Sequence, residues 1–206
     1  MTYELLENII PKQMIEYLQS YTSTVKKRIK PIEGKPKPNG SGVYWKGLDM
    51  ASSFEFATDD ENEKLYHIYT SNFMYNLITR YIPEPYLFND QIVVKEPFEQ
   101  FDFKPHYDNQ FGPHPNDKSL LTINCMLVLD DFTPENGAIK VFDKEWVTLY
   151  PKKGDVLLIE GNTLHSSEMN KSDSIRRAYL CVYSNKSIGE GFQKGFYHKK
   201  FNNNLT

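Results

Sequence analysis

The spacing of apolar residues divides the chain into a helical first part and a strand-rich second part. One amphipathic helix is predicted from Pro11 to about Lys27, and a second from about Asp60 to Arg80. Their apolar faces are formed by Met14, Ile15, Leu18, Tyr21 and Val25 in the first helix and by Leu65, Tyr69, Phe73 and Leu77 in the second. Prolines at 83 and 85 end the second helix. We therefore expect residues 1–85 to form a helical support.

The region between the two helices is rich in proline and glycine. Residues 31–42 are predicted to be a connecting loop, with a lid as the less favoured alternative, and residues 43–46 a short strand.

From residue 86 onward the apolar pattern changes to that of short strands separated by turns. The turns at 134–137 and 151–154 have the clearest turn chemistry, since each combines proline with glycine. The predicted strands are Tyr86–Lys95, Phe101–Asp108, Leu120–Leu129, Ala138–Phe142, Val147–Tyr150, Asp155–Glu160, Thr163–Ser167 and Arg176–Ser184. Strands without intervening helices favour a closed antiparallel sandwich or jelly roll, with the helices packed outside it. We expect one mostly β domain over residues 1–206, with its β core at about 86–185.

Composition narrows the classes of function. The 206 residues fit one domain, and the 14 tyrosines and 13 phenylalanines suit a packed β structure. A net charge of −3 gives no basis for a nucleic-acid partner. The sequence has neither a signal-peptide pattern nor an apolar run of membrane-spanning length, so we expect a soluble, cytoplasmic protein without a membrane partner. Both cysteines, Cys125 and Cys181, are expected to be reduced and buried.

Three residues form a candidate metal site. His106 and Asp108 lie two positions apart, so in a strand they would point to the same face. His165 follows several strands later and could return alongside them. Two imidazoles and one carboxylate make the facial triad that binds Fe(II) with three open positions. Zinc hydrolases use similar ligands, and the alternative for His-x-Asp alone is a surface hydrogen-bonded pair.

A candidate cosubstrate site accompanies these ligands. Arg176 follows His165 by eleven residues, and its planar fork of donors suits a dicarboxylate such as 2-oxoglutarate, which favours iron over zinc. Ser167 shares a strand face with His165 and could also bind the cosubstrate.

Two amides in apolar strands are further candidates for this pocket. Asn124 is the stronger, although a bond to neighbouring backbone is an equal alternative, and Gln91 is the weaker. His114 could contact substrate, with solvent exposure the favoured alternative.

Three motifs resemble the phytanoyl-CoA dioxygenase family of Fe(II)/2-oxoglutarate oxygenases over residues 86–185. They are Leu-Asp-Asp-Phe-Thr-Pro-Glu-Asn-Gly-Ala at 129–138, Lys-Gly-Asp-Val-Leu-Leu at 153–158, and Thr-Leu-His-Ser-Ser-Glu-Met-Asn-Lys-Ser at 163–172 followed by Arg176. The resemblance implies a double-stranded β-helix, iron ligation by His106, Asp108 and His165, and 2-oxoglutarate binding by Arg176 and Ser167. The chain lacks the Gly-Ser-His segment that many members carry. Its Phe-Lys-Pro-His-Tyr-Asp at 103–108 is also similar to prolyl 4-hydroxylase-like domains.

The function implied is a dioxygenase that uses Fe(II), 2-oxoglutarate and O2 and releases succinate and CO2. Related halogenases have a small residue at the position of Asp108, so hydroxylation is the expected outcome. The substrate could be a small molecule or a peptide, prolyl side chains included. The alternatives are a non-redox cupin-like hydrolase or isomerase and a binding module with a vestigial site. The sequence carries no prediction of oligomeric state.

Overall fold

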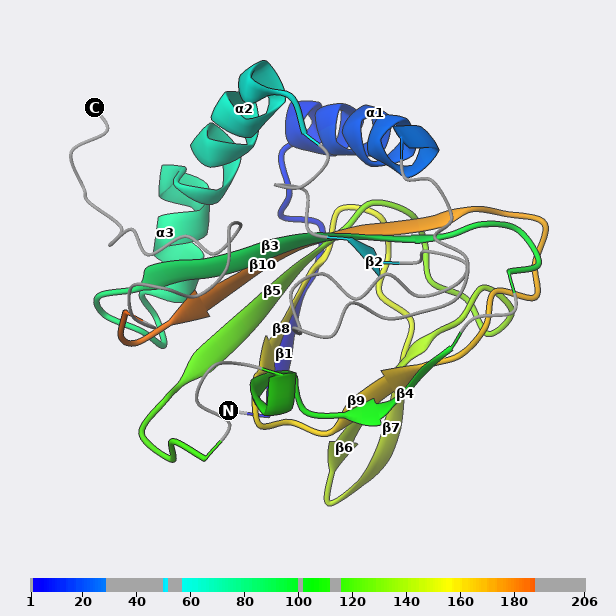
Figure 1. The fold of residues 1–206 in the computed structure, drawn as a ribbon. Helices are drawn as coiled ribbons and strands as arrows, with labels where there is room; N and C mark the ends of the chain where they lie inside the picture. Colours follow the sequence, from blue (N-terminus) through cyan, green and yellow to red (C-terminus); the bar gives the residue numbers. More distant parts are fainter. Residues whose placement is uncertain (1, 29–49, 52–56, 100–101, 112–115, 188–206) are drawn as a thin grey trace.

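The architecture is a β core of two sheets with helices on one outer face (Figure 1). The structure is a computed structural model, and it describes residues 2–28, 50–51, 57–99, 102–111 and 116–187. Helix α1 spans Lys12–Arg28, α2 spans Asp59–Tyr69 and α3 spans Asn72–Ile78. None of the helices in these ranges is long and apolar enough to cross a membrane.

The larger sheet has six strands in the order β1-β8-β5-β10-β3-β2. Every pairing in it is antiparallel. Its strands are β1 (Tyr3–Leu6), β2 (Met50–Ala51), β3 (Tyr86–Lys95), β5 (Thr122–Val128), β8 (Val156–Glu160) and β10 (Arg176–Ser184). The apolar faces of α1, α2 and α3 pack on one side of this sheet and bury a first core (Figure 1).

The smaller sheet has four strands in the order β4-β9-β6-β7. These are β4 (Phe103–His106), β6 (Ile139–Asp143), β7 (Glu145–Leu149) and β9 (His165–Ser167). Side chains from the inner faces of both sheets meet in a second core, which includes Val93, Val128 and Leu180 from the larger sheet and Ile139 and Val141 from the smaller. Two antiparallel sheets packed in this way form the jelly roll, or double-stranded β-helix, that the sequence predicted.

Several details differ from the sequence-based predictions, including strand β2, which was not predicted, and strand β9, which begins at His165 rather than Thr163. The helix predicted over 60–80 is two helices, because Ser71 caps α3 by accepting a hydrogen bond from the Met74 backbone N–H. The N-terminal strand β1 was not predicted, and it is held by pairing with β8 rather than by a pattern of its own. The predicted strand Phe101–Asp108 is shorter, and Asp108 instead begins the 3-10 turn Asp108–Phe111. The loop and strand predicted at 31–46, and His114, lie outside the described residues.

Candidate metal centre

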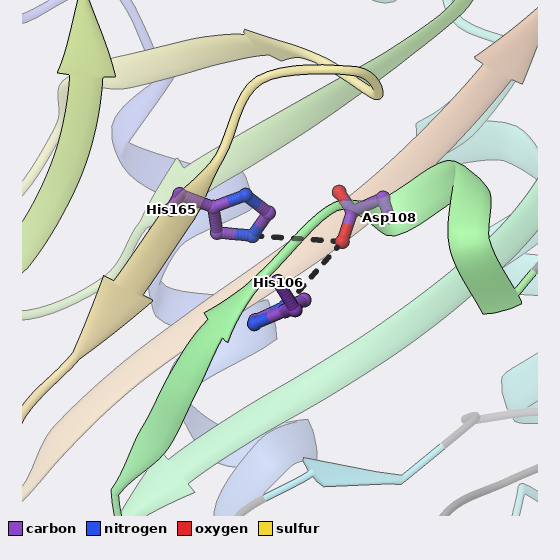
Figure 2. Close-up of side chains that lie close together, drawn as sticks. All are labelled: His106, Asp108 and His165. Carbon is purple, nitrogen blue, oxygen red and sulfur yellow. Dashed lines mark ion pairs between the residues drawn. The ribbon is translucent and has the colours of Figure 1, made fainter.

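The structure brings His106, Asp108 and His165 together at one end of the β core. One ligand atom from each residue can be chosen so that all three lie within 4.8 Å of one another. The Asp108 Oδ1 atom lies 3.7 Å from His106 Nε2 and 3.5 Å from His165 Nε2, as Figure 2 shows. Among the described residues, this is the one cluster of histidine, cysteine and acidic side chains with metal-binding geometry.

Strand pairing places the two histidines. His106 on β4 lies directly opposite His165 on β9, and their ring centroids are 4.3 Å apart. The Nδ1 atom of His106 lies 2.6 Å from the Lys104 carbonyl oxygen, and that of His165 lies 3.0 Å from the Thr163 carbonyl oxygen. A carbonyl can only accept a hydrogen bond, so each Nδ1 carries the proton and each Nε2 keeps a lone pair for a metal.

Asp108 reaches the site by a different route from the one predicted. It does not share a strand face with His106, because the chain turns into the 3-10 segment directly after β4. The turn nevertheless points the carboxylate back toward both imidazoles (Figure 2). Its second oxygen, Oδ2, accepts a hydrogen bond of 3.0 Å from the side-chain amide of Asn124 on β5.

Asn109, the residue after Asp108, connects the turn that carries Asp108 to the loop that leads into β9 and His165. The Asn109 backbone N–H donates to the carbonyl of Gly161, and its side-chain amide donates to Asn162 Oδ1. Asn109 Oδ1 accepts from the Thr122 hydroxyl. Gly161 allows this close approach, since a Cβ there would lie 1.9 Å from Thr122 Oγ1. The loop before β9 is thus fixed to the turn of Asp108.

The electrostatics of the site favour neutral imidazole. Burial lowers the pKa of His106, and the neighbouring His165 lowers it further. A neutral imidazole is the form that binds a metal ion.

A cationic region lies next to the candidate metal site, further along β9. Lys95 at the end of β3 pairs in register with Arg176 at the start of β10. Arg176 is 2% exposed and Lys95 is fully buried. The Lys95 ammonium donates to Ser167 Oγ at 3.0 Å and also to the Glu168 carbonyl, and it lies 5.3 Å from the centre of the Phe103 ring. Two neighbouring cations in the interior create a positive potential that favours a carboxylate.

The motif at 129–138 holds Arg176. The guanidinium donates to the Gly137 carbonyl at 2.6 Å and stacks 4.3 Å from the centre of the Phe132 ring. Gly137 has φ +86°, and a Cβ there would lie 2.3 Å from the Glu168 carbonyl oxygen, so only glycine fits. Arg177 turns the other way and pairs with Asp130 at 2.7 Å, next to α1.

Of the predicted cosubstrate residues, Ser167 and Arg176 lie together in this cationic region. Asn124 contacts the carboxylate of Asp108, and Gln91 lies on the same face of β3 as Lys95, opposite Leu180. Lys95 was not predicted from the sequence. The available signal was its spacing of four residues from Gln91 in the strand, which puts both side chains on one face.

The donor set fits a first-row divalent metal. Two imidazoles and one carboxylate are the ligands of non-heme Fe(II) and also of some zinc sites. The buried cationic region beside them could neutralise a carboxylate ligand, which a dicarboxylate cosubstrate would supply.

The comparisons with known proteins agree with this assignment. The sequence model of the phytanoyl-CoA dioxygenase family matches residues 83–142 and 140–178, which cover both histidines, Asp108 and Arg176. None of the curated proteins compared with the chain matches its sequence.

Solved structures share the fold. The non-heme alpha ketoglutarate dependent epimerase SnoN from nogalamycin biosynthesis is 15% identical and aligns with a TM-score of 0.70 over 92% of this chain and 82% of its own. AviO1 from Streptomyces viridochromogenes Tue57 is 17% identical, with a TM-score of 0.67 over 94% of this chain and 92% of its own. EctD from S. alaskensis, solved with 2-oxoglutarate and 5-hydroxyectoine, is 17% identical, with a TM-score of 0.66 over 88% of this chain and 71% of its own.

The fold and the site first define a class: a double-stranded β-helix with the two-histidine, one-carboxylate ligand set of the Fe/2-oxoglutarate-dependent oxygenases. Within that class, residues 83–178 are similar to the phytanoyl-CoA dioxygenase family, which confirms the resemblance seen in the sequence motifs.

Proposed function

We propose that the chain is an Fe(II)- and 2-oxoglutarate-dependent dioxygenase that hydroxylates a small-molecule or peptidyl substrate and releases succinate and CO2. The observation that carries the proposal is the combination of the convergent His106, Asp108 and His165 with a buried cationic region beside them. Neither feature alone separates an iron oxygenase from a zinc hydrolase. Together they match a metal that needs open positions and a cosubstrate that carries negative charge.

His106, Asp108 and His165 would hold the metal through two Nε2 atoms and one carboxylate oxygen. The bound Fe(II), together with 2-oxoglutarate and O2, supplies the oxidising power. The protein contributes the orientation of its ligands. The Lys104 and Thr163 carbonyls fix the tautomers of the histidines, and Asn109 holds the turn of Asp108 against the loop before β9.

Arg176, Lys95 and Ser167 would bind the distal carboxylate of 2-oxoglutarate. Arg176 presents a planar pair of donors, Lys95 adds a second charge, and Ser167 adds a hydroxyl. Ser167 follows His165 by two residues on β9, so this group lies one step along the strand from the metal ligands. That arrangement suits a cosubstrate that reaches from the metal into the interior.

A hollow of about 280 Å³ is lined by residues that include sequence neighbours of the candidate ligands, and none of the three ligands lines it. Tyr107, between the two ligands His106 and Asp108, lines it together with Phe142 and Leu164. Polar groups from Thr2, Glu160, Asn162 and Thr163 complete the lining.

Hydroxylation is the outcome we propose, because a third protein ligand occupies the position that a halide would need. SnoN and SnoK, which share the fold, are an epimerase and a carbocyclase. Product analysis therefore has to accompany any measurement of turnover.

The proposal is tested by anaerobic titration of the metal-free protein. Fe(II) followed by 2-oxoglutarate should produce a visible absorption band that requires both, whereas Zn(II), with its filled d shell, should produce none. Asp108→Ala should bind Fe(II) far more weakly and give no band, because it loses one of three protein ligands. A wild-type protein that binds Zn(II) tightly but shows no band with Fe(II) and 2-oxoglutarate would instead support the hydrolase or isomerase alternative.

A further inference from the structure

Asn124 is a polar residue in an otherwise apolar part of the β core. It lies in β5, where all seven residues are buried, and it is 4% exposed. Met126 and Val128 occupy the same face of the strand, and its neighbours in register are Ile159 on β8 and Val182 on β10. An amide in such surroundings destabilises the fold unless its polar atoms find partners.

The two ends of this amide are in different situations. Its nitrogen donates to Asp108 Oδ2 at 3.0 Å. A carboxylate only accepts hydrogen bonds, so the nitrogen must face Asp108 and the amide oxygen must point away from it. That oxygen, Oδ1, is buried and accepts no hydrogen bond within the part of the chain that the structure describes. A buried acceptor left in this state costs stability and calls for an explanation.

The geometry of Asp108 supplies the explanation. Asn124 binds Oδ2, and the other oxygen, Oδ1, is the one that lies 3.5 Å from His165 Nε2 and 3.7 Å from His106 Nε2. The hydrogen bond therefore separates the roles of the two carboxylate oxygens. One oxygen faces the metal position, and the other is held by β5.

We propose that Asn124 is a positioning residue that limits Asp108 to one metal-facing oxygen, and that the unsatisfied amide oxygen is the stability cost of this function. The inference rests on the proposed metal site, and it deepens that proposal by assigning a role to Asn124 other than cosubstrate contact. With a single carboxylate oxygen bound, the triad leaves three positions of an octahedral metal open. If Oδ2 were released, it could take one of the positions that the cosubstrate and dioxygen require.

The role is tested with Asn124→Leu, which is similar in size and has no hydrogen-bonding group. Two properties should change in opposite directions. The melting temperature of the metal-free variant should equal or exceed that of the wild type, because the unsatisfied oxygen is removed. Its affinity for Co(II), measured without 2-oxoglutarate, should fall about 10- to 100-fold, as is typical when a partner of a metal ligand is lost, and the visible spectrum of the bound Co(II) should change.

Met126→Leu is the matched control, because it alters the next position on the same face of β5 without touching Asp108. It should leave the Co(II) affinity and spectrum unchanged. If Asn124→Leu does not fold, Asn124→Val, which suits a strand, takes its place. The proposal is overturned if the metal-free variant is less stable while its Co(II) affinity and spectrum match the wild type, or if neither property changes.

The Co(II) measurement also separates this inference from the proposed activity. If Asn124 does not position Asp108, the wild type still binds Co(II) tightly. A wild type that binds Co(II) but never forms succinate with Fe(II) contradicts the oxygenase proposal alone. A wild type that binds no Co(II) contradicts the metal site and this inference with it.

Discussion

At the scale of single residues, the proposed cosubstrate site depends on two buried cations and one hydroxyl group. Lys95 and Arg176 face each other across β3 and β10, both buried, and Ser167 lies within hydrogen-bonding distance of the lysine. The sequence predicted Arg176 and Ser167 from their spacing after His165. It could not predict Lys95, because most lysines lie in solvent and the burial of this one depends on pairing with a strand some 80 residues away.

Replacing Arg176 tests the cosubstrate assignment. In Arg176→Lys the apparent KM for 2-oxoglutarate should rise about tenfold to hundredfold, because a lost hydrogen bond to a charged group costs about 1.5–3 kcal/mol. Titration calorimetry and succinate assays measure this, and Fe(II) affinity should change little. Arg177→Lys is the matched control, since Arg177 pairs with Asp130 outside the site. Equal effects from the two substitutions would show that Arg176 has only a structural role.

At the level of elements, the positions of the ligands depend on contacts between a loop and a turn. The loop after β8 and the turn after β4 meet at Gly161 and Asn109. Strands β4 and β9 pair His106 with His165, but the turn brings Asp108 into the group. The apolar pattern predicted most strands well, since alternation records which face is buried. It could not predict the 3-10 turn, the short strand β1 or the break between α2 and α3, which depend on capping and tertiary pairing.

Gly161→Ala should disturb this contact. The new Cβ would lie 1.9 Å from Thr122 Oγ1 and 2.5 Å from Asn109 Oδ1, so the turn or the loop must move. We expect metal affinity to fall about tenfold or more, as for other losses of support around a metal ligand. Gly154→Ala is the control. Its φ of +97° makes alanine unfavourable by about 1–3 kcal/mol, and the new Cβ would lie against Asn8 and Ile15 rather than against a candidate ligand. The control should lower the melting temperature and leave metal affinity unchanged. If Gly161→Ala left metal affinity unchanged while Gly154→Ala lowered it, the loop would not position the ligands.

In the molecule as a whole, the larger sheet separates two cores with different contents. The core between the two sheets adjoins the candidate metal site, and the core under the helices contains Asp90, a fully buried carboxyl group. Tyr179 donates a hydrogen bond to Asp90. Burial raises the pKa of Asp90 from 3.8 to about 7, against the smaller opposing effect of the tyrosine. The folded protein therefore holds this proton more tightly than the unfolded chain does.

This difference predicts a pH dependence of stability. The contribution of Asp90 is fully present below the unfolded pKa of about 3.9 and is lost as the pH rises through the folded value of about 7. Asp90→Asn should remove it. Urea unfolding of both proteins should show the wild type losing up to about 3 kcal/mol relative to the variant between pH 5 and pH 8. A constant difference between the two proteins over this range would contradict the assignment.

We propose above all that the two histidines and Asp108 hold Fe(II), and that the buried cationic region holds the 2-oxoglutarate that O2 oxidises there. The most direct measurement is succinate formation by the Fe(II)-loaded protein in the presence of 2-oxoglutarate and isotopically labelled O2. We expect the wild type to form CO2 and succinate that carries one oxygen atom from O2, and His165→Ala to form succinate only at background level. Succinate without label, or none above the His165→Ala background, would contradict the proposal.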